Sequence, residues 1–101
     1  MKVIKRDGHM VDWCPEKVEA AIMKANNEVE DEDQASGTQI KNIIKYIERL
    51  GKKRILVEDM QDIIEQKLME IGKYELAKKY IVYRYTRALV RKSNTTDETI
   101  L

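Results

Sequence analysis

The fold is decided first by the stretch KVIKRDGHMVDW, residues 2–13. Asp7-Gly8 lies between two short apolar segments and favours a two-residue type I′ turn, because glycine adopts positive φ without steric cost. Pairing outward from this turn predicts that Ile4 lies opposite Val11 and that both share one face with Trp13. An isolated hairpin is marginally stable in water, so the segments that follow must cover this face.

Four segments with helical periodicity follow the predicted hairpin. Pro15 suits a first helical position, and residues 36–39 form a capping box for a second helix. The acidic pair Glu58-Asp59 favours a third helix start, and a fourth helix is predicted from about Tyr74 into the region of Arg91. The apolar positions predicted to face the core are Val18, Ala21, Ile22, Ala25, Ile40, Ile43, Ile44, Ile47, Leu50, Met60, Ile63, Ile64, Leu68, Ile71, Leu76, Ala77, Tyr80, Ile81, Ala88 and Leu89.

Three further stretches complete the predicted architecture. The polar, acidic residues 26–37 are expected to form a solvated loop, and residues 54–57 suit a third, edge strand. The polar residues 93–101 are not expected to order by themselves. The predicted fold is α+β and mainly helical, a four-helix bundle capped by an N-terminal β-hairpin and a short third strand.

Composition narrows the classes of function. The 101 residues suit one domain, and 43% hydrophobic with 37% charged residues indicate a globular chain. Its 19 basic and 18 acidic residues nearly cancel, so general attraction to nucleic acid or to an anionic membrane is not expected. The single cysteine excludes an internal disulfide, and no apolar run reaches membrane-spanning length or resembles a signal peptide. We expect a cytoplasmic protein.

Clustered cations are the sequence feature that points to a ligand. Arg84, Arg87 and Arg91 fall at i, i+3 and i+7 and continue an inward-facing stripe. Such arginines either extend to water along apolar stems or meet an anion. Taken alone, Lys5-Arg6 beside Asp7-Gly8 is typical of a common surface turn. Lys17 lies in a first helical turn, where its positive charge opposes the helix dipole. Together, these cations could instead converge on one phosphate chain.

The sequence offers no catalytic constellation. His9 has no nucleophile partner, and Cys14 has no neighbouring histidine and suits a helix start. The acidic residues 28–33 lack the glycine and the spacing of a calcium loop. No phosphate-binding glycine loop, metal-ligand pattern or carboxylate pair occurs, so we expect a non-catalytic binding domain.

Several separated motifs together resemble a known family. They are Val3-Ile4-Lys5-Arg6-Asp7-Gly8, then Val11 and Trp13, then Glu16-Lys17-Val18 with Ala21-Ile22, then Val57 to Ile64, and finally Ala77 to Arg87 (AKKYIVYRYTR). In this order and spacing they resemble the ATP-cone domain, over roughly residues 2–92. We therefore expect an ATP-cone domain over residues 1–92.

The resemblance implies an allosteric role. ATP-cones are nucleotide sensors at the N-terminus of ribonucleotide reductases, the oxidoreductases of deoxyribonucleotide biosynthesis, where ATP activates and dATP inhibits. Residues 91–101 are similar to the passage from the cone into the barrel of anaerobic (class III) ribonucleoside-triphosphate reductases. Residues 93–101 are accordingly expected to be a linker towards the catalytic domain of such a parent enzyme, and this domain itself is expected not to be an enzyme.

The resemblance also implies site residues. The residues implied to contact phosphate are Lys5, Arg6, Lys17 and Arg87, with Arg84 as a helper, and those implied around the base are the backbone of Val3 and Ile4 with Val18, Val57 and Tyr83. The segment from Val11 to Glu16 would form a wall between strand and helix. Some relatives carry a carboxylate at Val11, a threonine at Val57 and a histidine at Gln61, positions implied to read the ribose. ATP or dATP is expected to bind with Mg²⁺.

Two alternatives from other classes remain open. ATP-cones also occur in a transcriptional regulator of reductase genes, where a four-cysteine zinc ribbon precedes the cone. The second alternative is a helical oligomerisation module, and homo-oligomers through cone contacts are an expected partner interaction. Where nucleotide controls the domain, the nucleotide would act by favouring one geometry of the helical bundle over another.

Overall fold

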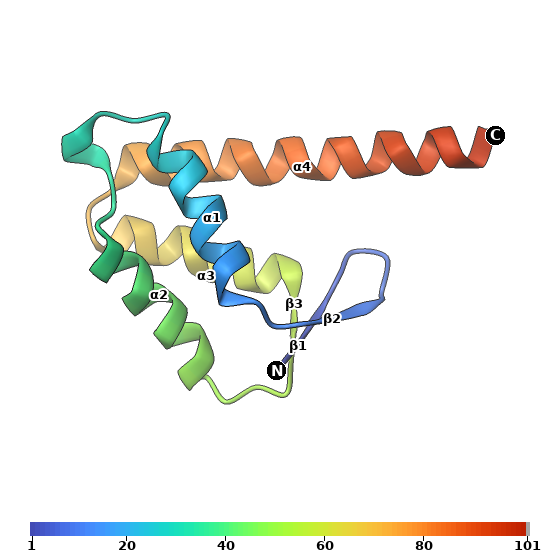
Figure 1. Ribbon diagram of the computed structural model, residues 1–101, viewed down its shortest axis with the longest axis horizontal. Coiled ribbons are helices and arrows are strands. Elements are labelled where there is room, and N and C mark those ends of the chain that lie inside the picture. The colour runs from blue at the N-terminus through green and yellow to red at the C-terminus, as the bar shows by residue number, and fades with distance from the viewer. Residues whose placement is uncertain (101) are drawn as a thin grey trace.

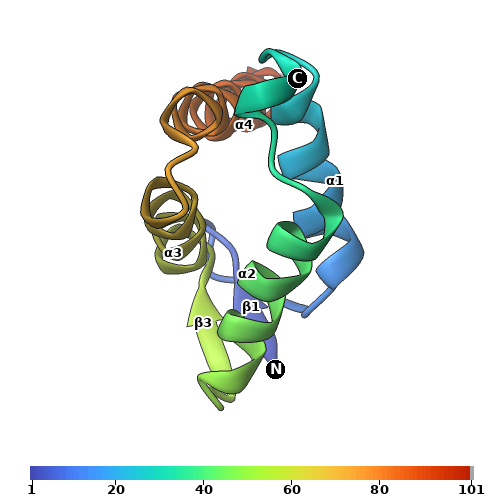
Figure 2. The same cartoon turned by 90° about the vertical axis from the view of Figure 1, so that its left-hand side faces the viewer.

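The computed structural model describes the backbone of residues 1–100 and the side chains of residues 1–89. The elements in chain order are β1 (Lys2–Ile4), β2 (Met10–Asp12), α1 (Pro15–Asn26), the 3₁₀ turn η1 (Asp31–Asp33), α2 (Gly37–Arg49), β3 (Arg54–Leu56), α3 (Val57–Glu70) and α4 (Tyr74–Ile100). Helices α3 and α4 lie side by side, α1 and α2 lie across from them, and the sheet lies at one end (Figures 1 and 2). The predicted mainly helical α+β fold is confirmed.

The sheet contains the hairpin and the third strand, in the order β2-β1-β3. β1 pairs antiparallel with β2 and parallel with β3, which lies at an edge as predicted. The predicted hairpin register is wrong by one residue, because Val3 and not Ile4 lies opposite Val11. Since side chains alternate across a sheet, this shift buries Val3 and leaves Ile4 on the other face.

The shift arises in the turn, which has three residues where the sequence predicts two. The N–H of Gly8 donates to the carbonyl of Lys5 at 2.9 Å, and the N–H of Lys5 donates to the carbonyl of His9 at 2.8 Å. Gly8 has φ of 91°, which closes this longer loop without strain. Asp7 accepts the N–H of His9 at 3.1 Å, and this hydrogen bond lowers the pKa of the Asp7 carboxyl.

The helix starts follow the predicted signals. Pro15 opens α1 after Cys14, and Ser36 and Gln39 form the predicted capping box of α2, with hydrogen bonds of 3.1 and 2.9 Å. α3 begins at Val57, immediately before the predicted acidic pair. The backbone of α4 remains helical to Ile100, so the helix does not end near Arg91 and residues 93–100 are not irregular. The linker role of residues 93–101 stays a prediction.

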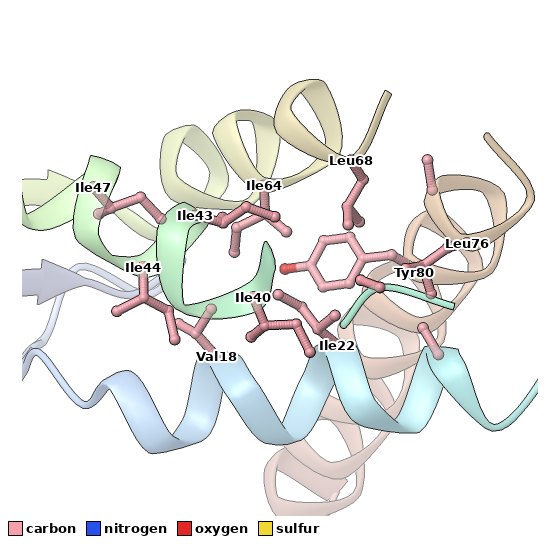
Figure 3. Packing of buried hydrophobic residues seen from close by; sticks show 13 residues of the cluster. Val18, Ile22, Ile40, Ile43, Ile44, Ile47, Ile64, Leu68, Leu76 and Tyr80 are labelled. Atoms are coloured by element: carbon pink, nitrogen blue, oxygen red, sulfur yellow. The ribbon is translucent and has the colours of Figure 1, made fainter. Parts of the chain in front are cut away.

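The main core lies between the four helices and is aliphatic apart from one tyrosine. Ile22, Ile64, Leu68 and Leu76 are fully buried, and the ring of Tyr80 points among them from α4 (Figure 3). A smaller cluster of Val3, Ile55 and Val57 lies under the sheet. Four residues predicted to face the core are instead exposed, because they lie at helix ends or on the outer side of α4: Leu50, Ile71, Ile81 and Leu89.

The segment predicted as a solvated loop contains two buried residues. Asn26 ends α1 and is 2% exposed. Its side-chain amide donates to the carbonyl of Ala35 at 3.0 Å, and its side-chain oxygen accepts the N–H of Ala35 at 3.0 Å. These two hydrogen bonds tether the loop to α1, so the prediction is wrong for Asn26 and Ala35.

Candidate functional site

A pocket of about 340 Å³ opens where the sheet, α1, the start of α3 and the middle of α4 meet. Eleven of the thirteen predicted site residues line it: Val3, Lys5, Arg6, Val11, Lys17, Val18, Val57, Gln61, Tyr83, Arg84 and Arg87. These residues come from both ends of the described chain. The fold therefore brings Lys5, Arg6, Lys17, Arg84 and Arg87 to one pocket, whereas Arg91 lies outside the described side chains. That these cations contact phosphate stays a prediction.

The cations reach the pocket from three elements. Lys5 and Arg6 come from the β1–β2 hairpin, whereas Lys17 lies in the first turns of α1. Arg84 and Arg87 lie three residues apart on α4 and so share its pocket face. A pocket with this many positive side chains suits an anionic ligand with several charges.

Arg84 is already occupied by carboxylates of α3. Its Nη1 donates to Asp62 Oδ1 at 2.8 Å and to Glu65 Oε1 at 2.5 Å. Burial disfavours the charge of Arg84, but the hydrogen bonds that it donates to both carboxylates outweigh this effect and raise the pKa of the guanidinium. With its side chain only 15% exposed, Arg84 acts first as a clasp between α3 and α4.

Arg6 makes a looser contact with the same helix. Its Nη1 lies 3.0 Å from Glu58 Oε1, and its Nη2 donates to Gln61 Oε1 at 3.4 Å. The two charged side chains are 34% and 59% exposed, so water and salt screen this pair. Arg6 therefore remains available to another anion.

Lys17 and Arg87 differ from these arginines. Within residues 1–89, no hydrogen bond or ion pair occupies the side-chain nitrogens of Lys17 or Arg87. Both side chains are exposed at the pocket rim, and each must reach it from a different helix. An anion between α1 and α4 would gain two charge-assisted contacts without breaking an existing ion pair.

The remaining wall of the pocket is apolar and aromatic. Val18 and Val57 are buried at its base, and Tyr83 is half-buried with its ring 6.4 Å from that of Tyr80. Lys24 Nζ lies 5.8 Å from the centre of the Tyr83 ring, in range for a cation–π contact. Burial raises the pKa of Tyr80, so its hydroxyl stays neutral. A flat, weakly polar ring fits this side.

Two predicted residues do not line the pocket. Ile4 lies on the opposite face of the strand from Val3, a consequence of the corrected register. Glu16 is exposed at the start of α1, where its carboxylate accepts from its own backbone N–H and from Cys14 Sγ at 3.3 Å. Both contacts lower the pKa of Glu16 and hold it at the helix start.

Asp12, Trp13 and Cys14 also line the pocket, and they belong to the wall predicted over Val11 to Glu16. The lining residues that the sequence did not single out for the site are Ala20, Ala21, Lys24, Met60, Tyr80 and Ala88. Of these, Lys24 could have been found. It follows Lys17 by two helical turns, about 10 Å along the axis, with small alanines on the face between. That pattern places a second lysine beside the first on the pocket face of α1.

Two features of the described residues concern other functions. Among them, no three or more His, Cys, Asp or Glu side chains are grouped so as to hold a metal ion. Within the same part of the chain, no helix has both the length and the apolar character required to cross a bilayer. His9 is exposed and paired with Asp7, and Cys14 is a free thiol at the start of α1.

Comparison with known proteins gives one consistent result. The chain is 34% identical over 108 residues to the ribonucleoside-diphosphate reductase subunit alpha of Chlamydia trachomatis, covering 96% of this chain and 10% of that protein. It is 38% identical over 91 residues to the vitamin B12-dependent ribonucleoside-diphosphate reductase of Mycobacterium tuberculosis, covering 89% and 13%. Identity to the anaerobic ribonucleoside-triphosphate reductase of Escherichia coli is lower, at 28% over 90 residues, covering 89% and 12%.

The chain therefore spans about a tenth of the length of these reductases. Of these three identities, the one to the anaerobic reductase is the lowest, whereas the sequence analysis indicated that class of parent enzyme. The family model described as the ATP cone domain matches residues 1–89, which contain every residue of the pocket. This chain belongs to the ATP-cone domain family.

Proposed function

We propose that this chain is an allosteric module that binds ATP or dATP in the pocket between the sheet, α1 and α4. The observation that carries the proposal is that two exposed cations, Lys17 and Arg87, which have no ion-pair partner among side chains 1–89, line one pocket that also has an apolar wall. Among the described side chains, they are the pocket cations best placed to receive phosphate. Family membership supports an adenine nucleotide as the ligand.

The polar and apolar walls suggest an orientation for the nucleotide. The triphosphate would lie between Lys17 and Arg87, with Lys5 and Arg6 from the hairpin. The base would lie near Val18, Val57 and Tyr83, with Val3, Val11 and Gln61 along the ribose side. In this arrangement Arg84 would not contact phosphate directly, because it already binds two carboxylates. Mg²⁺ would enter as the nucleotide complex, held by the phosphate oxygens.

The proposed target of regulation is a ribonucleotide reductase, since all three compared relatives carry that name. The narrower proposal of an anaerobic triphosphate reductase depends on the resemblance of residues 91–101. The higher identities to diphosphate reductases favour another class of parent enzyme. Assaying the full-length protein with CTP and with CDP, each with and without dATP, tests both the regulation and the class.

Calorimetric titration with MgATP and MgdATP tests nucleotide binding directly. A charge-assisted contact contributes about 1.5–3 kcal/mol, so Lys17→Ala or Arg87→Ala should each weaken binding about ten- to a hundred-fold. Lys79→Ala removes the same charge from an exposed position of α4 outside the pocket and should change the Kd less than about two-fold. Failure of the unmodified protein to bind either nucleotide at millimolar concentration would refute the proposal.

A second candidate function is nucleotide-dependent self-association. It is favoured by exposed apolar side chains on the outer side of α4, away from the pocket: Val82 is 61% exposed, Tyr85 65% and Leu89 48%. We expect light scattering to report a larger particle when dATP is added. A particle size that is the same with and without dATP would mean that these exposed side chains do not mediate nucleotide-dependent self-association.

A further inference from the structure

Helix α3 carries a row of three carboxylates that are not themselves part of the pocket lining. Glu58, Asp62 and Glu65 fall at i, i+4 and i+7, so they lie on one side of the helix. Glu58 binds Arg6 of the hairpin, while Asp62 and Glu65 bind Arg84 of α4. The row therefore engages two arginines that line the pocket, Arg6 from the N-terminal hairpin and Arg84 from the last helix of the chain.

The two contacts differ in how easily a ligand could exchange them. The Arg84 side chain is 15% exposed and that of Glu65 18%, so separating them would leave a largely buried carboxylate without its partner. Arg6 and Glu58 form one contact of 3.0 Å in a much more exposed setting. Phosphate oxygens can accept two parallel N–H bonds from a guanidinium, so a triphosphate competes well for Arg6.

We propose that Glu58 is an internal competitor of the bound nucleotide, occupying Arg6 until a phosphate displaces it. The inference rests on the proposed function, since it concerns the same pocket. The exchange removes the ion pair between the hairpin and the first turn of α3, whereas the Arg84 clasp between α3 and α4 persists. Nucleotide binding thereby changes one inter-element contact and leaves the other, which makes Glu58 a determinant of affinity and of the coupling between hairpin and α3.

Asp59 provides a matched control for this idea. It is also acidic and exposed in the first turn of α3, so its neutralisation changes the net charge and the helix terminus in the same way. No ion pair or hydrogen bond joins its side chain to the other described side chains. Any difference between Glu58→Gln and Asp59→Asn then reports the loss of the contact with Arg6.

Calorimetric titration of MgATP into four variants tests the proposal. Glu58→Gln should lower the Kd for MgATP about three-fold, the size expected when an exposed ion pair no longer competes. The change in Kd caused by Asp59→Asn should be less than half as large. In the Arg6→Ala background, adding Glu58→Gln should have no further effect on the Kd.

Two results would overturn the inference. Equal tightening by Glu58→Gln and Asp59→Asn would mean that only the general negative field matters. A persistent effect of Glu58→Gln without Arg6 would mean that Glu58 acts through another group. Absence of MgATP binding by the unmodified protein is a separate outcome, and it would refute the proposed function before Glu58 is considered.

Discussion

The two ends of this domain are built for different purposes. Where α2 and the first turns of α4 meet α1 and α3, the interior is a dry aliphatic core that contains Ile64 and Leu76, both fully buried (Figure 3). At the sheet end, α1, α3 and α4 instead line a pocket that contains several lysines and arginines, most of them exposed. The difference shows that stability is concentrated in one half and ligand-binding capacity in the other.

Helix α4 joins the two halves. Leu76 and Ala77 in its first turns are buried, whereas Arg84 and Arg87 farther along line the pocket. Tyr80 lies between these sets and touches both the core and the pocket. A ligand held by Arg87 is therefore connected to the core through one continuous helix, and this connection offers a path by which binding can bias the bundle.

Among the differences between the two halves, the largest expected effect is on the free energy of unfolding when a core side chain is truncated. Ile64→Ala removes a fully buried side chain and should lower the free energy of unfolding by about 2–5 kcal/mol. Ile81→Ala makes the same chemical change at a position that is 37% exposed on α4, where the loss should be well under half as large. Urea unfolding followed by circular dichroism measures both values.

The Ile64 result also bears on the pocket half. Below the unfolding transition, folded Ile64→Ala should bind MgATP with nearly unchanged affinity, whereas Arg87→Ala should lose affinity but keep most of the stability. If Ile64→Ala and Ile81→Ala destabilised the domain equally, the assignment of the core to this half would be wrong. If Arg87→Ala unfolded the domain, the two halves would not be separable.

Much of this division was predictable because its signals are local. The capping box at Ser36, the proline that opens α1 and the helical spacing of apolar residues each act within a few residues, so they indicated the helices correctly. The family motifs also placed Lys17 and Arg87 in one site, and both residues line the pocket. Local chemistry and recurring motifs therefore gave the elements and most of the pocket lining.

What the sequence did not reveal depends on choices between near-equal alternatives or on distant partners. Val3 and Ile4 are both apolar, so composition could not decide which one faces inward, and the three-residue turn did. The carboxylates that bind Arg84 are separated from it by 19 and 22 residues, and their pairing requires the packing of α3 on α4. Such contacts follow from the tertiary structure and leave little trace in a single sequence.

The role of Asn26 was not apparent from the sequence. Its substitution gives the smaller of the two predicted changes in stability. Asn26→Ala would leave the buried N–H and carbonyl of Ala35 without partners and should cost about 1–3 kcal/mol of unfolding free energy. Asn27→Ala, at the exposed neighbouring position, should change stability by about 0.5 kcal/mol or less. Thermal melting of both variants in the absence of nucleotide measures the difference.

The location of Asn26 makes this test informative about the core and pocket halves of the domain as well as about the loop. The residue lies at the end of α1 opposite Lys17, so its loss should loosen the connection between α1 and α2 while leaving the pocket lining in place. Amide exchange should therefore rise in residues 27–36 of Asn26→Ala, with little change at residues 14–18. Equal exchange in both segments would mean that α1 transmits the disturbance along its whole length, and that core and pocket behave as one cooperative unit.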